Sequence, residues 1–214
     1  MRLKIKLCGI RDKESLIAAC DSDYIGFVFY QKSPRFINAL DAKKLREFIR
    51  PHQKLVGLFV DADINLISYI NDFLNLDIIQ LHGEENQIYI KKIKDLGKPV
   101  IKAIPINSYA DLKKSKQFEK LCDMILFDTK TSLQVSGGTG ISFDWNLLRR
   151  YDSSVNWILA GGLNINNVTE AIKTTNASFI DISSGVEKSR GVKCPNKIKQ
   201  FLNYVRNYEK NKFS

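Results

Sequence analysis

The chain has 214 residues, of which 44% are hydrophobic and 26% charged, and its formal net charge is +10. This composition is typical of a globular protein and excludes an intrinsically disordered chain. No apolar run approaches the ~20 residues that a membrane-spanning helix requires. The charged segment at the N-terminus does not resemble a signal peptide. We therefore expect one domain over residues 1–214, in the cytoplasm and without a membrane partner.

Short apolar runs alternate with amphipathic stretches along the whole chain. Apolar residues three and four positions apart predict helices at 41–49, 65–73, 88–96 and 198–205. The apolar runs themselves are nearly continuous, as expected for parallel strands covered on both faces. They begin near Leu3, Tyr24, Leu55, Ile78, Pro99, Asp123, Val155 and Ala177.

Eight strands that alternate with helices predict a single-domain (β/α)₈ barrel, with little room for insertions in 214 residues. An open doubly wound sheet shares this alternation and is the structural alternative. It is disfavoured because Cys8 and Gly9 follow the first strand where such sheets carry G-x-G-x-x-G. The glycine turns lie instead in the last two units, and the barrel is therefore our prediction.

The stretch 155–187 contains the strongest sign of a ligand. Its two strands end in small residues, first Gly161 and Gly162, then Ser183, Ser184 and Gly185. Glycine lets the main chain approach a ligand closely, and consecutive backbone N–H groups bind anions. The alternative is a pair of tight turns without a ligand. Because two such turns close successive units, we predict that they form a phosphate site.

Other reactive side chains stand at the predicted carboxyl ends of strands, where barrels carry their chemistry. Cys8 could be a nucleophile or base with a lowered pKa, although a free cysteine is more often a small core residue. Asp128 follows an apolar run that suits a general acid, or it caps a helix. Arg35 offers a fork for a carboxylate, and an ordinary surface arginine is the alternative. We expect His82 to support another residue by a hydrogen bond rather than to react itself.

Three further features exclude other sites or leave alternatives open. The four cysteines are spaced too widely for a zinc knuckle or CxxC pair, and two distant histidines suggest no metal site. The basic residues from Lys188 onward fit a solvated helix better than a nucleic-acid-binding module. The glycine-rich segment 130–142 is either a lid over the barrel or a surface loop, with a helix expected near Asp144.

These residues lie in eight motifs that occur in order along the chain. They are KLCGI at 6–10, GFVF and SPR within 26–35, VGLFVD at 56–61, IQLHGEE at 79–85, LFDT at 126–129, GGTG and FDW within 137–145, LAGGL at 159–163 and DISSGVE at 181–187. With them the chain resembles the phosphoribosylanthranilate isomerases, the third-step isomerases of tryptophan biosynthesis. The resemblance implies a (β/α)₈ barrel that needs no metal or organic cofactor. It also implies an Amadori rearrangement of N-(5-phosphoribosyl)anthranilate to 1-(2-carboxyphenylamino)-1-deoxyribulose 5-phosphate.

The resemblance also assigns roles to individual residues. Cys8 matches the general base and Asp128 the general acid, whereas Arg35 matches the residue that faces the anthranilate carboxylate. Asp181 matches a position near the substrate hydroxyls. The phosphate site matches Gly161, Gly162, Ser183, Ser184 and Gly185. The expected partner is a small phosphorylated substrate, for a monomer or a homodimer. Ile141 and Cys194 depart from the residues that the family commonly carries, and neither departure affects these roles.

Three rival functions remain as alternatives. The sugar isomerase of histidine biosynthesis shares the expected mechanism but would carry aspartate where this chain has Cys8. Indole-glycerol-phosphate synthase would need a lysine–glutamate site and a longer N-terminus. A basic nucleic-acid-binding protein would explain the charge of +10, but it explains neither Cys8 nor the two glycine turns. We therefore predict an isomerase and no nucleic-acid partner.

Overall fold

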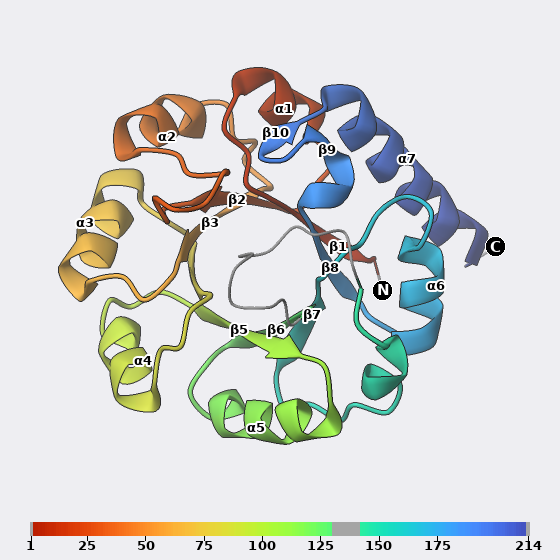
Figure 1. Ribbon diagram of the computed structural model, residues 1–214. Coiled ribbons are helices and arrows are strands. Elements are labelled where there is room, and N and C mark those ends of the chain that lie inside the picture. The colour runs from red at the N-terminus through yellow and green to blue at the C-terminus, as the bar shows by residue number, and fades with distance from the viewer. Residues whose placement is uncertain (1, 130–141, 213–214) are drawn as a thin grey trace.

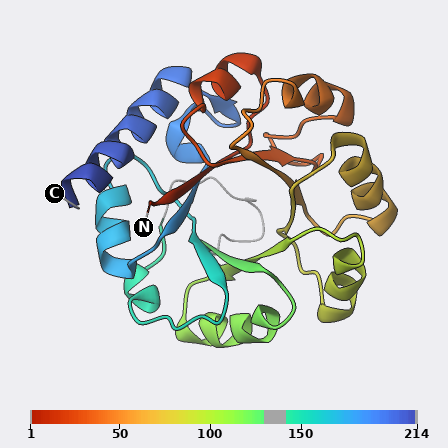
Figure 2. The same cartoon turned by 180° about the vertical axis from the view of Figure 1, so that it is seen from behind.

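A computed structural model describes residues 2–129 and 142–212 of the chain. Eight parallel strands close into one barrel in the order β1 to β8, and helices surround it (Figures 1 and 2). The predicted (β/α)₈ fold is thereby confirmed. The segment proposed as a lid, 130–142, lies outside the described residues except for its last one. The strands are β1 Lys4–Cys8, β2 Tyr24–Val28, β3 Lys54–Phe59, β4 Ile78–Leu81, β5 Val100–Ile106, β6 Met124–Thr129, β7 Asn156–Leu159 and β8 Phe179–Ile182.

Among the described residues, six α-helices lie between or after strands of the barrel, and a seventh follows the last hairpin. Five of them begin with a side chain that accepts a hydrogen bond from the first turn, which satisfies an otherwise unpaired N–H group. These caps are Asp12, Asn38, Asp63, Asn86 and Ser108. The helices are α1 Lys13–Ala18, α2 Ala39–Arg46, α3 Ile64–Leu74, α4 Gln87–Lys94, α5 Tyr109–Glu119, α6 Val168–Thr175 and α7 Pro195–Lys212.

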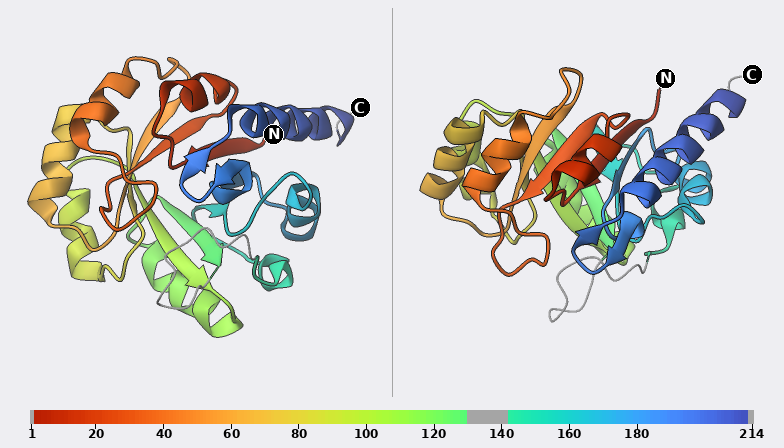
Figure 3. Two further views of the ribbon diagram at one scale, coloured as in Figure 1. Left: turned by 45° about the horizontal axis from the view of Figure 1, so that its top comes forward. Right: turned by 90° about the horizontal axis from the view of Figure 1, so that it is seen from above.

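The unit after β6 differs from the expected pattern. In place of a helix near Asp144 the chain forms one 3₁₀ turn, η1 Trp145–Leu148, which Asp144 caps. Beyond β8, a short 3₁₀ turn η2 Ser184–Val186 leads into an antiparallel hairpin of β9 Glu187–Ser189 and β10 Val192–Lys193. Figure 3 places this hairpin at one end of the barrel, with the start of β1 and the end of α7 at the other.

Barrel closure brings the two ends of the sequence together. β1 pairs with β8, and the register sets Lys6 opposite Asp181. A cluster of buried side chains fills the inside of the barrel. Within it, Tyr24 stacks on Phe179 with ring centroids 4.6 Å apart. Such a core makes the barrel a packed layer rather than a pore. Its buried members are Tyr24, Val56, Ile78, Ile101, Ala103, Leu126, Ile158, Ala160 and Phe179.

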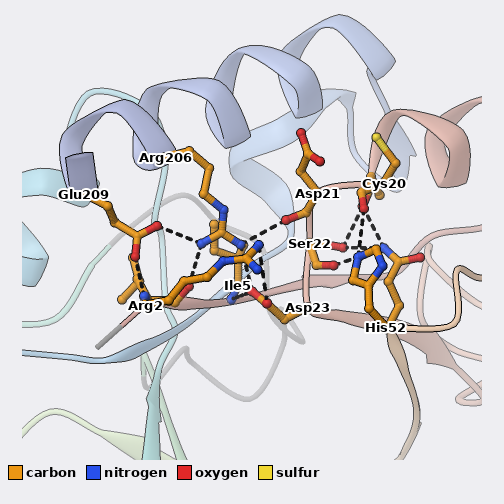
Figure 4. A network of polar contacts seen from close by, with 12 residues as sticks. Arg2, Ile5, Cys20, Asp21, Ser22, Asp23, His52, Arg206 and Glu209 are labelled. Atoms are coloured by element: carbon orange, nitrogen blue, oxygen red, sulfur yellow. Dashed lines mark hydrogen bonds and ion pairs between the residues drawn. The ribbon is translucent and has the colours of Figure 1, made fainter.

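Arg206 of α7 binds the segment that leads into β1. Arg206 Nη1 donates to Leu3 O at 2.7 Å and to Glu209 Oε2 at 2.8 Å, and Nη2 donates to Asp23 Oδ2 at 2.9 Å (Figure 4). Its side chain is 15% exposed, whereas that of Arg2, 3.7 Å from Asp23, is 61% exposed. Within residues 2–129 and 142–212 no helix has the length and apolar character needed to cross a membrane.

Replacement of Arg206 by alanine is expected to lower the free energy of unfolding by about 3 kcal/mol, since it removes the short ion pairs of two largely buried carboxylates, Asp23 and Glu209. Urea unfolding followed by circular dichroism measures this change. Arg2→Ala is the matched control and should cost less than about 1 kcal/mol, because an exposed ion pair contributes little. Equal losses in the two variants would contradict the role given to Arg206.

Candidate active site

The glycine turn after β7 has the conformation predicted for it. Gly161 and Gly162 have positive φ angles of 85° and 65°, which side chains other than glycine rarely adopt. A Cβ atom at Gly161 would lie 2.3 Å from Thr129 Oγ1, so this position excludes larger residues. The side-chain amides of Asn164 and Asn167 donate to Gly162 O at 3.2 and 3.0 Å. They fix the turn, and α6 begins just after it, at Val168.

The turn after β8 packs directly against the first one. A Cβ atom at Gly185 would lie 2.0 Å from Leu163 O, and only glycine allows this approach. The backbone N–H groups of Gly162, Ser184 and Gly185 donate to no acceptor within the part of the chain that the structure describes. Unpaired N–H groups on two adjoining turns can bind an anion. The structure therefore brings all five predicted phosphate-binding positions together in one cup.

Cys8 ends β1 beside this cup and is only 5% exposed. Ser183 Oγ donates to Cys8 O at 3.0 Å. Burial raises the pKa of the Cys8 thiol, and the neighbouring Lys6 ammonium opposes this rise. The sequence left open a lowered pKa for this thiol, and in the structure burial outweighs the nearby positive charge.

Lys6 is a component of the site that sequence analysis missed. It lies two residues before Cys8 on β1, so the two side chains share the inner face of the barrel. A Cβ atom at Gly26 would lie 3.1 Å from Cys8 Sγ and 3.2 Å from Lys6 Nζ, so this glycine leaves the room that both side chains occupy. The spacing of Lys6 and Cys8 was the signal that could have revealed it.

The fully buried ammonium of Lys6 is paired with the predicted site residue Asp181. Its Nζ lies 2.8 Å from Asp181 Oδ2, and although burial opposes the charge, Asp181 raises the pKa of Lys6. Asp181 Oδ1 is buried and accepts no hydrogen bond within the described residues. An unpaired buried oxygen is costly unless a ligand donates to it. Asp181 is therefore suited to accept a hydrogen bond from a substrate hydroxyl.

Asp128 and His82 lie close together at the mouth of the barrel, the end at which its strands have their carboxyl termini. His82 Nε2 lies 3.2 Å from Asp128 Oδ2, and Asp128 Oδ1 accepts a hydrogen bond from the Thr129 N–H at 2.7 Å. The other ring nitrogen of His82, Nδ1, lies 3.0 Å from Gln80 Nε2. The ring of His82 is thus held between Gln80 and Asp128. This is the supporting position expected for His82.

Arg35 reaches the mouth from the segment after β2, and its partner is a carboxylate of the same chain. Its Nε and Nη2 donate to Glu187 Oε1 and Oε2 at 2.7 and 3.0 Å, in the bidentate geometry that guanidinium groups favour. Within the described residues its Nη1 has no partner, and this group remains for a ligand. Glu187 stands in the DISSGVE motif, but no local pattern indicated that it pairs with Arg35.

The Arg35–Glu187 pair predicts how the protein responds to acid. Burial favours the protonated carboxyl of Glu187, but hydrogen bonds from Arg35 and the charge of Lys193 prevail and lower its pKa to about 2. The corresponding stability, about 3 kcal/mol, is present above the unfolded-state pKa near 4.5 and is lost as the pH falls toward 2. In urea titrations the difference in stability between wild type and Glu187→Gln should therefore shrink between pH 5 and 2.5. The exposed Glu47→Gln is the matched control and should differ little in stability from wild type, because an exposed side chain contributes little. A constant difference for Glu187→Gln would contradict the prediction.

The predicted reactive groups thus surround one mouth. Asp181 lies within electrostatic reach of Lys6, Asp128 and His82, and the charge of Asp181 in turn acts on Cys8. The fold and this cluster define a class, the (β/α)₈ barrels that gather ionisable side chains and glycine turns at the carboxyl ends of their strands.

Comparisons with known proteins identify the family within that class. The family model described as N-(5′-phosphoribosyl)anthranilate (PRA) isomerase matches residues 5–204, and the chain belongs to this family. It is 42% identical to the enzyme of that name from Agrobacterium fabrum over 98% of both chains, and 40% identical to that of Rhodospirillum rubrum over 94% and 97%.

Solved structures agree with this assignment. The isomerase from Thermotoga maritima is 34% identical, with a TM-score of 0.88, and the alignment covers 96% of this chain and 99% of that one. A second isomerase structure contains reduced 1-(o-carboxyphenylamino)-1-deoxyribulose 5-phosphate. It is 31% identical with a TM-score of 0.82, over 96% and 99% of the two chains.

Proposed function

We propose that a single barrel domain, residues 1–214, catalyses the Amadori rearrangement of N-(5-phosphoribosyl)anthranilate in tryptophan biosynthesis. The observation that carries this proposal is the cluster at the mouth, where Cys8 and Asp128 accompany two separate groups suited to anions. One is the cup of glycine and serine N–H groups, and the other is Arg35. The substrate carries a phosphate at one end and a carboxylate at the other, so each of the two groups would bind one of them.

In the first step Asp128 acts as general acid. It donates a proton to the ring oxygen of the ribose while the C–O bond at C1 breaks and the anthranilate nitrogen forms a double bond to C1. His82 and the Thr129 N–H hold the carboxyl group in place. Because the leaving oxygen is protonated as it departs, no alkoxide has to form.

In the second step Cys8 acts as general base. Its thiolate removes the hydrogen at C2 of the Schiff base, which gives an enolamine. The enolamine then loses the proton of its C2 hydroxyl and gains one at C1, so that the product is the ketone and no net proton is consumed. Lys6 stabilises the thiolate, and Asp181 Oδ1 accepts a hydrogen bond from a substrate hydroxyl. These transfers use side chains alone, and we propose that the reaction needs no cofactor.

The setting of the enzyme follows from the same proposal. The free thiols of all four cysteines suit a reducing cytoplasm. The protein acts as a monomer or a homodimer, and a relative from Thermotoga maritima is described as dimeric. Its small anionic substrate accounts for part of the positive charge.

Turnover of the anthranilate substrate by the purified protein tests the function. We expect the fluorescence of the substrate to disappear at enzyme concentrations far below those of the substrate, equally with and without a metal chelator. A protein that leaves the fluorescence unchanged would refute the proposed function. Loss of activity only in the chelator would refute independence from metal ions.

A further inference from the structure

The β9–β10 hairpin, which follows the phosphate cup in the chain, carries a buried lysine that points back into the site. Lys193 is 3% exposed. Its Nζ donates to Ser183 O at 2.9 Å, to Ser183 Oγ at 3.0 Å and to Glu187 Oε1 at 2.9 Å. Ser183 in turn donates to Cys8 O. The lysine therefore contacts a residue of the cup that adjoins the base.

Glu187 extends the same contacts to the other anion-binding group. Its two oxygens accept from Arg35 Nε and Nη2, and Oε2 also accepts from the N–H group of Gly191 at 3.0 Å. The side chains of Lys193, Glu187 and Arg35 are 1%, 5% and 7% exposed, so water screens their charges little. Arg35, Glu187, Lys193 and Ser183 form one continuous chain of buried polar contacts.

The backbone around these polar contacts is closely packed. Gly191 has a φ of 81°, and a Cβ atom there would lie 2.4 Å from Pro34 O, next to Arg35. A Cβ atom at Gly9 would lie 2.7 Å from Arg35 Cδ. The hairpin therefore packs closely against Pro34, and the end of β1 packs closely against Arg35. The ion pair with Glu187 holds the guanidinium group.

From these contacts we propose that Lys193 is a positioning residue that holds Arg35 and the cup at the spacing required by the two charged ends of the substrate. This inference rests on the proposed function, because it assumes that one molecule occupies both groups. Lys193 touches neither the acid nor the base through its side chain, and its effect should fall on binding more than on the chemical steps.

The charge on Lys193 predicts a pH dependence of ligand affinity. Burial lowers the pKa of Lys193 to about 8 although Glu187 opposes this. The charged or ionisable groups that act on it are Glu187 from β9, Arg35 from the segment after β2 and Cys8 from β1. When Lys193 loses its proton, Glu187 loses a counter-ion and the mouth loses one positive charge. Affinity for a ligand with a phosphate and a carboxylate should therefore fall as the pH rises through 8.

The experiment compares the affinity of wild type, Lys193→Met and Lys188→Met for the reduced product analogue that a relative binds. Isothermal titration calorimetry at pH values from 6.5 to 9.5 gives the Kd, and steady-state assays at pH 7 give kcat and KM. We expect Lys193→Met to raise Kd and KM about tenfold or more at pH 7 and to change kcat by less than about threefold. In Lys193→Met, Kd should not show the rise above pH 8 that we expect for wild type. Lys188 is exposed on the same hairpin, and its variant should match wild type.

Several outcomes would overturn the inference. One is a Kd for Lys193→Met within twofold of wild type, even if the melting temperature falls, because the lysine would then only stabilise the fold. Another is an unchanged rise of Kd above pH 8 in that variant. If Lys193→Met does not fold, Lys193→Gln decides, since it keeps a donor for Ser183 but lacks the charge. A wild-type protein that neither binds the analogue nor turns over substrate would instead refute the proposed function.

Discussion

Replacement of Cys8 by alanine is expected to lower kcat by on the order of 10³-fold while the protein stays folded. The variant has no group at the end of β1 that can remove the hydrogen at C2, and Lys6 cannot substitute because Asp181 holds its ammonium in the charged form. The side chain is small and lies at the mouth, so its loss leaves only a minor gap in the packing. Substrate loss followed by fluorescence measures the rate, and circular dichroism checks the fold.

A second cysteine provides the control for this prediction. Cys122 is also 5% exposed, and burial raises the pKa of its thiol to about 12. It precedes β6 at the end of the barrel opposite the mouth, so Cys122→Ala should keep the activity of wild type. A Cys8→Ala variant with a rate within tenfold of wild type would show that another group is the base.

The raised pKa of Cys8 also predicts the shape of its pH profile. Since burial favours the thiol over the thiolate, kcat at saturating substrate should still rise with pH above 7, until Cys8 is ionised. Lys6→Met removes the charge that opposes this effect and should move the rise to higher pH. Alkylation of Cys8 by iodoacetamide, measured against pH in both proteins, reports the same ionisation without substrate. An identical profile in the two proteins would exclude Lys6 from this role.

Replacement of Asp128 by asparagine should have an effect of similar size, about 10²–10⁴-fold on kcat. Asparagine keeps the shape of the side chain, and its Oδ1 can still accept from the Thr129 N–H, whereas its amide nitrogen replaces the oxygen that faces His82. It has no acidic proton for the ring oxygen. Ring opening would then produce an unprotonated oxygen, and this step should become rate-limiting. Stopped-flow measurements with Asp128→Asn are expected to show slow loss of the substrate without accumulation of the Schiff base.

Two comparisons separate this chemistry from a structural effect. Asp144→Asn changes an exposed cap of η1 and should leave kcat unaltered. The affinity of Asp128→Asn for the reduced product analogue should stay within a few-fold of wild type, since the anion-binding groups are intact. A rate for Asp128→Asn close to that of wild type would exclude Asp128 as the general acid.

The regular parts of the barrel were predictable because they depend on neighbours in the sequence. All eight strands begin within about two residues of the predicted positions, since a buried parallel strand needs an apolar run of its own. Helices α3 and α4 follow the spacing of their apolar residues in the same way. The prediction of a helix near Asp144, after β6, was wrong, because the chain forms a 3₁₀ turn there.

The positions in the candidate site were also largely predictable. A reactive residue at the end of a barrel strand must face the mouth, and this rule placed Cys8 and Asp128 correctly on β1 and β6. The glycine turns were recognisable because residues with a side chain rarely adopt a positive φ. Their roles in catalysis and phosphate binding stay predictions that the proposed experiments test.

The local sequence therefore specified the strands, the turns and the end of the barrel at which Cys8, Asp128 and the cup lie. It did not specify the electrostatic state of those groups, because that depends on partners distant in the chain. Lys6 meets Asp181 across 175 residues and Arg35 meets Glu187 across 152. Barrel closure creates both pairs, and burial makes their charges matter. Folding of the whole chain thus sets the raised pKa of Cys8 and the spacing of the anion-binding groups, since both arise from contacts that no local pattern encodes.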